Sequence, residues 1–176
     1  MALQRRERRR QQYLSLGVGE LVAAAVFCLT AANAIQPRLM GTEASVLWIA
    51  LLPLLLVLWQ SGAYWLLARS WVAGGSMPDA VAAVYRVFRV LDALVLAGSL
   101  VAIILWLPSR IPVLVLVIAV WLFALVEYVN YFVVRLSYPL TQWASRVGEW
   151  RTPQLIRDLR RSSQKLEDGN PTALAP

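Results

Sequence analysis

The sequence predicts an all-α integral membrane protein, a four-helix bundle with a C-terminal amphipathic interfacial helix. Apolar residues make up 59% of its 176 positions, which is more than a typical soluble fold contains. Four apolar runs each reach the length of about 20 residues that a helix needs to cross a bilayer. The net charge of +7 is concentrated in two arginine-rich tails, which favours contact with anionic lipid headgroups.

The bundle is expected to occupy residues 13–138. Its four predicted spans cover roughly residues 13–35, 45–67, 84–107 and 113–136. Pro53 lies inside the second span, where it should kink the helix or leave a backbone carbonyl that a neighbouring group satisfies. Gly17 and Gly19 in the first span, and Gly98 in the third, provide small surfaces for close helix approach.

The distribution of basic residues predicts the orientation, because basic residues beside a span resist translocation. The N-terminal residues 1–12 hold five arginines, and the segment from Arg135 onward holds seven basic residues, whereas the two opposite loops hold only Arg38 and Arg110. Both termini are therefore expected to be cytoplasmic, in the inner membrane of a bacterium. In an alternative, residues 1–34 are a signal peptide cleaved after an Ala-x-Ala pattern, which would leave three spans and an external amino terminus.

Residues 139–161 change from uniformly apolar to amphipathic and basic. The first helix expected here carries an apolar stripe of Leu140, Trp143, Val147 and Trp150. Thr152 and Pro153 then suit the start of a second helix, which places Leu155, Ile156 and Leu159 on one side. Such a helix either lies in the headgroup layer or packs on the base of the bundle. The polar residues 162–176 are expected to be disordered.

The composition excludes several kinds of chemistry. The chain has no histidine and a single cysteine, Cys28, so an imidazole metal site, a His-ligated haem, a Ser-His or Cys-His catalytic pair and an intrachain disulfide are ruled out. We therefore expect no catalytic residue, cofactor or metal site. The N-terminal arginines have no interleaved aromatic residues, which disfavours nucleic acid. The expected partners are the bilayer, anionic headgroups at the tails, and a membrane protein or a second copy of the chain.

Ionisable residues inside apolar runs form the candidate functional site, because hydrocarbon does not solvate charge. Arg86, Arg89 and Asp92 follow an i, i+3, i+6 spacing on the third span, which keeps them on one face. At about 1.5 Å per residue, all four spans deliver polar groups to a similar depth. The predicted cluster contains Glu20, Gln60, Tyr64, Arg86, Arg89, Asp92, Glu127, Asn130 and Tyr131.

Three functions fit this cluster. In the leading one, Arg89 pairs with Glu127, and Arg86 pairs with Asp92 or a lipid phosphate, as a structural clip in a non-enzymatic accessory or scaffold protein. In the second, Glu20 and Glu127 take up protons or bind a cationic substrate in a small proton-coupled transporter or exporter. In the third, an intramembrane enzyme acts on lipid with carboxylates and a tyrosine, Tyr64 or Tyr131.

Two features resemble known membrane proteins. Residues 127–132 (EYVNYF) and 135–139 (RLSYP) resemble stretches of small multi-spanning bacterial membrane proteins to which no activity is assigned. A glutamate in the first of four spans, here Glu20, is similar to that of the small multidrug exporters. The second resemblance implies a transport role for Glu20, although this chain is longer and has additional arginines in its third span.

Overall fold

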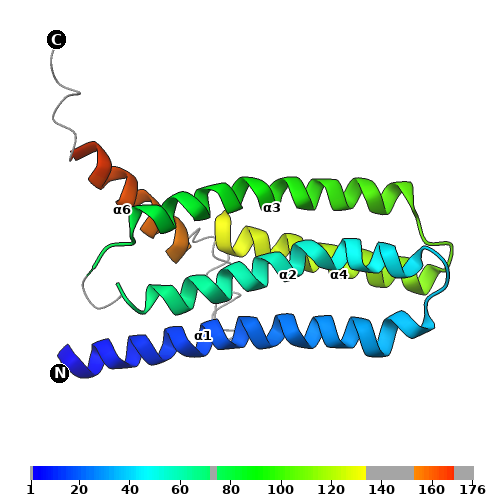
Figure 1. The fold of residues 1–176 in the computed structure, drawn as a ribbon, viewed down its shortest axis with the longest axis horizontal. Coiled ribbons are helices and arrows are strands. Elements are labelled where there is room, and N and C mark those ends of the chain that lie inside the picture. Colours follow the sequence, from blue (N-terminus) through cyan, green and yellow to red (C-terminus); the bar gives the residue numbers. More distant parts are fainter. Residues whose placement is uncertain (1, 72–74, 134–152, 169–176) are drawn as a thin grey trace, which may run out of the picture.

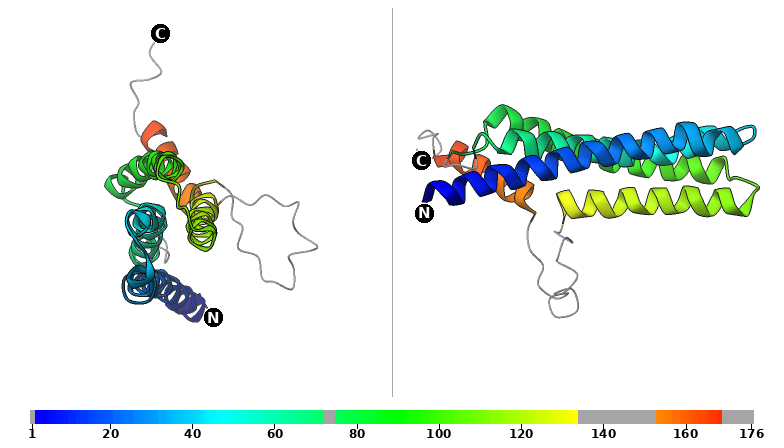
Figure 2. Two further views of the ribbon diagram at one scale, coloured as in Figure 1. Left: turned by 90° about the vertical axis from the view of Figure 1, so that its right-hand side faces the viewer. Right: turned by 90° about the horizontal axis from the view of Figure 1, so that it is seen from below.

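The computed structural model describes residues 2–71, 75–133 and 153–168. Within these ranges it contains helices and no strand. Four long helices run up and down beside one another, and a short fifth helix lies at one end of the bundle (Figure 1, Figure 2). They are α1 (Ala2–Thr30), α2 (Glu43–Ala68), α3 (Asp79–Leu105), α4 (Ile111–Phe132) and α6 (Gln154–Asp168). The four long helices are apolar enough to span a membrane, which confirms the predicted all-α four-span fold.

The helix ends differ from the predicted ends in physically interpretable ways. Helix α1 begins at Ala2, before the predicted start at residue 13, so the arginine-rich N-terminal residues form the first turns of this helix. It ends in a π-helical turn, Ala31–Ile35, and a 3-10 turn that contains Pro37. Helix α3 starts at Asp79, before the predicted residue 84, because the extended backbone of Pro78 ends the preceding loop. The predicted end of the fourth span, residues 134–136, lies outside the described residues.

Helix α2 is the central helix and contacts each of the other three spans. Its leucines, including Leu47, Leu54 and Leu58, are buried together with Ala24 of α1 and Ala124 of α4. The outward faces of α1, α3 and α4 instead carry exposed large apolar side chains. Examples are Val22, Leu94, Val115 and Leu122. An apolar outer surface of this kind is expected where the surrounding solvent is lipid.

Two glycines allow α1 and α2 to approach closely. A Cβ atom added at Gly17 would lie 3.0 Å from the carbonyl oxygen of Gly62, and one added at Gly62 would lie 3.1 Å from the carbonyl oxygen of Gly17. Small residues permit such backbone contact between helices in a membrane. Because Glu20 lies one turn after Gly17, this crossing also holds Glu20 close to α2.

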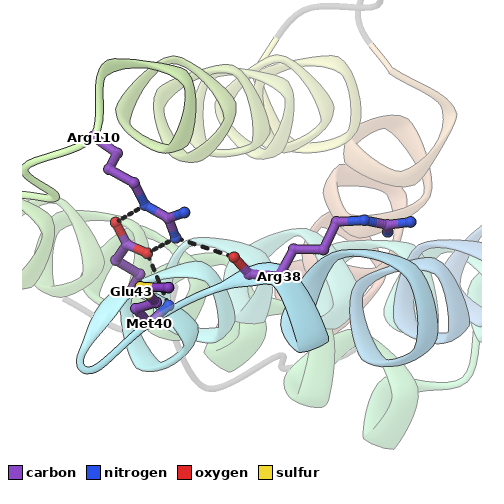
Figure 3. Close-up of polar contacts among 4 residues, drawn as sticks. All are labelled: Arg38, Met40, Glu43 and Arg110. Carbon is purple, nitrogen blue, oxygen red and sulfur yellow. Dashed lines mark hydrogen bonds and ion pairs between the residues drawn. The ribbon is translucent and has the colours of Figure 1, made fainter.

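At the end of the bundle opposite to α6, an ion pair joins the two loops (Figure 3). Arg110 pairs with Glu43 through two nitrogen atoms and also donates to the carbonyl oxygen of Arg38 at 3.2 Å. The Glu43 carboxylate accepts a further hydrogen bond from the backbone N–H of Met40 at 2.9 Å. The sequence singled out the loop arginines but not Glu43. Together these contacts tie the α1–α2 connection to the α3–α4 connection.

Replacing Arg110 with glutamine should lower the thermal unfolding temperature of the detergent-solubilised protein slightly, because the Arg110 side chain is 43% exposed, so water and salt screen its ion pair with Glu43. Glu43→Gln should have a similar effect, and the double variant should be no less stable than either single variant. Arg38→Gln is the matched control, since Arg38 contributes its backbone carbonyl and its side chain points away from the pair (Figure 3). Equal losses in Arg38→Gln and Arg110→Gln would contradict the assignment.

Helix α6 packs on the base of the bundle, which is one of the two placements that the sequence left open. Its apolar residues Leu155, Ile156 and Leu159 are buried in a cluster with Tyr64 and Tyr85. The helix continues to Asp168, so the disorder predicted from residue 162 onward is wrong for 162–168. The reason is tertiary contact, since the buried Ser162 hydroxyl donates to Asp79 at 2.9 Å. The predicted stripe from Leu140 to Trp150 and the tail after residue 168 lie outside the described ranges.

Candidate functional site

Glu20 of α1 and Glu127 of α4 line one cavity of about 180 Å³ near the α6 end of the bundle. Its walls come from α1, α2 and α4, and the start of α6 closes one side. The polar and aromatic residues that line it are Glu20, Tyr64, Trp65, Glu127, Asn130, Tyr131 and Gln154, and Leu16, Pro153 and Leu155 complete the walls. None of these lining residues, all from the described part of the chain, is basic.

A chain of hydrogen bonds positions Glu20. The indole Nε1 of Trp65 donates to the hydroxyl of Tyr131 at 3.2 Å, and that hydroxyl donates to the Glu20 carboxylate. The ring of Tyr13 packs edge-on against Trp65, with ring centroids 5.0 Å apart. These contacts join α2, α4 and α1, so the Glu20 carboxylate is fixed by three helices.

The second carboxylate, Glu127, lines the same cavity as Glu20 and Asn130. Two carboxylates in one cavity repel each other when both are ionised, so a proton or another cation between them is stabilising. Tyr64, Trp65 and Tyr131 supply aromatic surface to the same cavity. Aromatic faces attract cations as well, so the site is suited to a small positively charged ligand.

The two predicted ion pairs within the protein, Arg89 with Glu127 and Arg86 with Asp92, are not formed. Arg86 and Arg89 are exposed on the outside of α3, and within the described residues neither makes an ion pair. Arg86 Nε donates to the carbonyl of Ala82 in its own helix at 3.3 Å. Positions i+3 and i+6 are rotated by about 60° and about 120° around a helix. This rotation lets the long arginine side chains turn outward, while Asp92 is buried.

Asp92 and Gln60 form a separate polar pair between α2 and α3. The amide Nε2 of Gln60 donates to Asp92 Oδ1 at 3.0 Å. The hydroxyl of Tyr85 donates to the backbone carbonyl of Gln60 at 2.7 Å. The nine predicted residues therefore divide into three sets. They are Glu20, Tyr64, Glu127, Asn130 and Tyr131 at the cavity, Gln60 and Asp92 between α2 and α3, and Arg86 and Arg89 on the outer face.

Helix α6 adds a buried carboxylate that the sequence analysis missed. Asp158 accepts hydrogen bonds from the Tyr64 hydroxyl at 2.8 Å, from Trp71 Nε1 at 3.2 Å and from Gln154 Nε2 at 3.0 Å. A signal was present, because Asp158 follows Leu155 by three residues and so falls on the apolar side of the predicted helix. This contact attaches α6 to the end of the cavity.

No protein-family model matches the sequence, no curated protein is significantly similar to it, and no solved structure matches the fold. The geometry of the site is therefore the basis for inferring the function.

Proposed function

We propose that the protein is a small transporter or exporter of organic cations, which exchanges its substrate for protons at Glu20 and Glu127. The observation that supports this most is the cavity, which holds both carboxylates and three aromatic side chains and has no basic residue among its described lining. Its volume of about 180 Å³ suits a small organic ammonium ion. Binding of a proton or of such an ion would relieve the same repulsion between the carboxylates, and this competition is what proton coupling requires.

We further propose that the protein resides in the inner membrane of a bacterium with both termini in the cytoplasm. The start of α1 and helix α6 lie at the same end of the bundle (Figure 1), and Arg8, Arg9 and Arg10 are exposed there. Arginines at one end favour the cytoplasmic side and its anionic headgroups. The cavity would then open from the cytoplasmic half of the membrane.

Glu20→Gln and Glu127→Gln should each weaken binding of choline, used as a small quaternary ammonium probe, by about tenfold or more, because each removes a charge from the cavity wall. Binding can be followed by isothermal titration calorimetry. In proteoliposomes with an imposed pH gradient, both variants should lose pH-dependent choline uptake. Glu7→Gln is the matched control, because Glu7 is exposed and outside the cavity.

The neutral isostere 3,3-dimethyl-1-butanol separates charge recognition from simple apolar binding. It should bind far more weakly than choline to the wild-type protein. Equal binding of the two compounds, or equal weakening by Glu7→Gln and Glu20→Gln, would contradict the proposed cation site. Binding without uptake would retain the cation site and reject transport.

An accessory or scaffold function is the second candidate, and the outer face of α3 supports it. Arg86 and Arg89 are exposed there beside the exposed apolar residues Val87 and Val90. Arginines on an apolar face suit contact with lipid phosphates or with acidic groups of a membrane partner. The third function, an intramembrane enzyme that acts on lipid, stays a prediction. The two tyrosines named for it, Tyr64 and Tyr131, both donate their hydroxyl hydrogen atoms to carboxylates.

A further inference from the structure

A second acidic site lies outside the cavity, between α2 and α3. Asp92 is 1% exposed and Gln60 is 8% exposed. One hydrogen bond joins them, from Gln60 Nε2 to Asp92 Oδ1 at 3.0 Å. The hydroxyl of Tyr85 fixes the backbone at Gln60. Two polar side chains from different helices are thus held against each other in the interior of a membrane bundle.

The remaining oxygen atoms of this pair require one hydrogen atom. Gln60 Oε1 and Asp92 Oδ2 are both buried, and neither has a hydrogen-bond partner in the described part of the chain. Both are acceptors when the carboxyl group is ionised. A proton on Asp92 Oδ2 makes that oxygen a hydrogen-bond donor. The amide oxygen of Gln60 is an acceptor without a donor, so it can accept this hydrogen bond. Rotating the Gln60 amide by 180° would place its oxygen atom against Asp92 Oδ1. Two acceptors would then face each other, so a hydrogen atom on the carboxyl group would still be required.

No positive charge replaces that proton. The ionisable or charged side chains on the helices around Asp92 include Tyr64 on α2, Tyr85, Arg86 and Arg89 on α3, Tyr128 on α4 and Asp158 on α6. Within the described residues, none of them forms a hydrogen bond or an ion pair with the Asp92 carboxyl group. An ionised carboxylate that is buried without a charged partner is costly.

We infer that Asp92 and Gln60 form a proton-binding site that joins α2 to α3. The proton resides on Asp92 Oδ2 and is shared with Gln60 Oε1, so the carboxylic acid and the amide exchange two hydrogen bonds. Loss of the proton would leave a buried carboxylate against an amide oxygen and weaken the α2–α3 contact. This inference does not depend on the function of the Glu20–Glu127 cavity.

Infrared spectroscopy of the protein in lipid nanodiscs tests the inference directly. The wild-type protein at neutral pH should show a C=O stretching band of a protonated carboxylic acid, which shifts in D₂O and is absent from Asp92→Asn. Glu20→Gln should retain this band, which separates Asp92 from the cavity acids. If the spectra of the wild type and Asp92→Asn do not differ in this region at neutral pH, the inference is overturned.

Thermal unfolding of matched variants provides a second test that does not rely on spectral assignment. Asp92→Asn preserves both hydrogen bonds with Gln60 and should unfold within about 3 °C of the wild type, whereas Asp92→Leu leaves the buried amide without a partner and should unfold well below it. The unfolding temperature of the wild type should fall as the pH rises and the proton is lost, and that of Asp92→Asn should fall less, because only the other acids of the protein still titrate. Arg89→Gln should keep the wild-type pH dependence.

Sodium is the control ligand, because two unpartnered oxygen atoms are also suited to a hard cation. Replacing potassium chloride with sodium chloride at constant ionic strength should leave the unfolding temperature of the wild type unchanged. A sodium-dependent increase that Asp92→Asn abolishes would overturn the inference in favour of a sodium site. A large destabilisation by Asp92→Asn would overturn it in favour of an ionised Asp92.

Discussion

Replacing Gly62 with leucine should force α1 away from α2 and destabilise the protein by about 3 kcal/mol, which corresponds to a decrease of about 10 °C in unfolding temperature. A Cβ atom at Gly62 would lie 2.8 Å from Leu21 Cγ and 3.1 Å from the carbonyl oxygen of Gly17. The Leu21 side chain can change its conformation, but the backbone of α1 at Gly17 cannot move without separating the two helices. Because Glu20 lies one turn from this crossing, the variant should also lose choline binding.

Glycines that face away from the bundle provide the matched controls. Gly19 on α1 and Gly98 on α3 are exposed, and a Cβ atom at either position would meet no atom within 4 Å. Gly19→Leu and Gly98→Leu should therefore preserve the unfolding temperature or raise it slightly, since leucine favours a helix more than glycine does. If Gly19→Leu is as damaging as Gly62→Leu, the loss reflects a general effect of leucine and not the α1–α2 crossing.

The sequence predicted which residues share a depth in the membrane, and this was sufficient to bring the cavity residues together. The length of each apolar run fixes where a helix enters the bilayer, and the helical rise then places Glu20 and Glu127 at similar depths. Both glutamates line the same cavity. The period of the amphipathic segment likewise predicted the buried side of α6, with Leu155, Ile156 and Leu159.

The sequence could not predict which polar residues contact one another, because depth does not determine rotation about the helix axis. Arg89 and Glu127 were expected to pair, yet Arg89 faces outward. Asp92 has an arginine three residues away, but its partner Gln60 comes from another helix. Gly17 and Gly19 looked equivalent in sequence, and only Gly17 lies at the crossing with α2. Such contacts depend on the packing of whole helices.

Replacing Asp158 with alanine should release α6 from the bundle. The carboxylate is the shared acceptor for Tyr64, Trp71 and Gln154, and Tyr64 is fully buried. Each buried donor that loses its acceptor costs about 1–3 kcal/mol. Because α6 is attached mainly by this contact and a short apolar stripe, its docking should be lost while the four spans remain folded.

Limited proteolysis measures this release, because trypsin can cleave after Arg160 once α6 leaves the bundle. Cleavage after Arg157 is not a suitable readout, since Asp158 is the next residue and its replacement changes that cleavage site. Cleavage of Asp158→Ala should be at least about tenfold faster than cleavage of the wild type, which is the ratio expected for a loss of about 1.4 kcal/mol in docking free energy. Asp79→Ala is the control, because it removes only the hydrogen bond from Ser162 at the other end of α6 and should accelerate cleavage less. Equal cleavage of Asp158→Ala and wild type would show that the apolar stripe alone holds α6.

The same variant connects α6 to the cavity. Pro153, Gln154 and Leu155 form one side of the cavity that contains Glu20 and Glu127, so release of α6 should open that side to water. Choline should then bind to Asp158→Ala more weakly and dissociate faster, since water screens the carboxylates and the enclosing wall is lost. If cleavage accelerates while choline binding is unchanged, α6 covers the base of the bundle without contributing to the cation site.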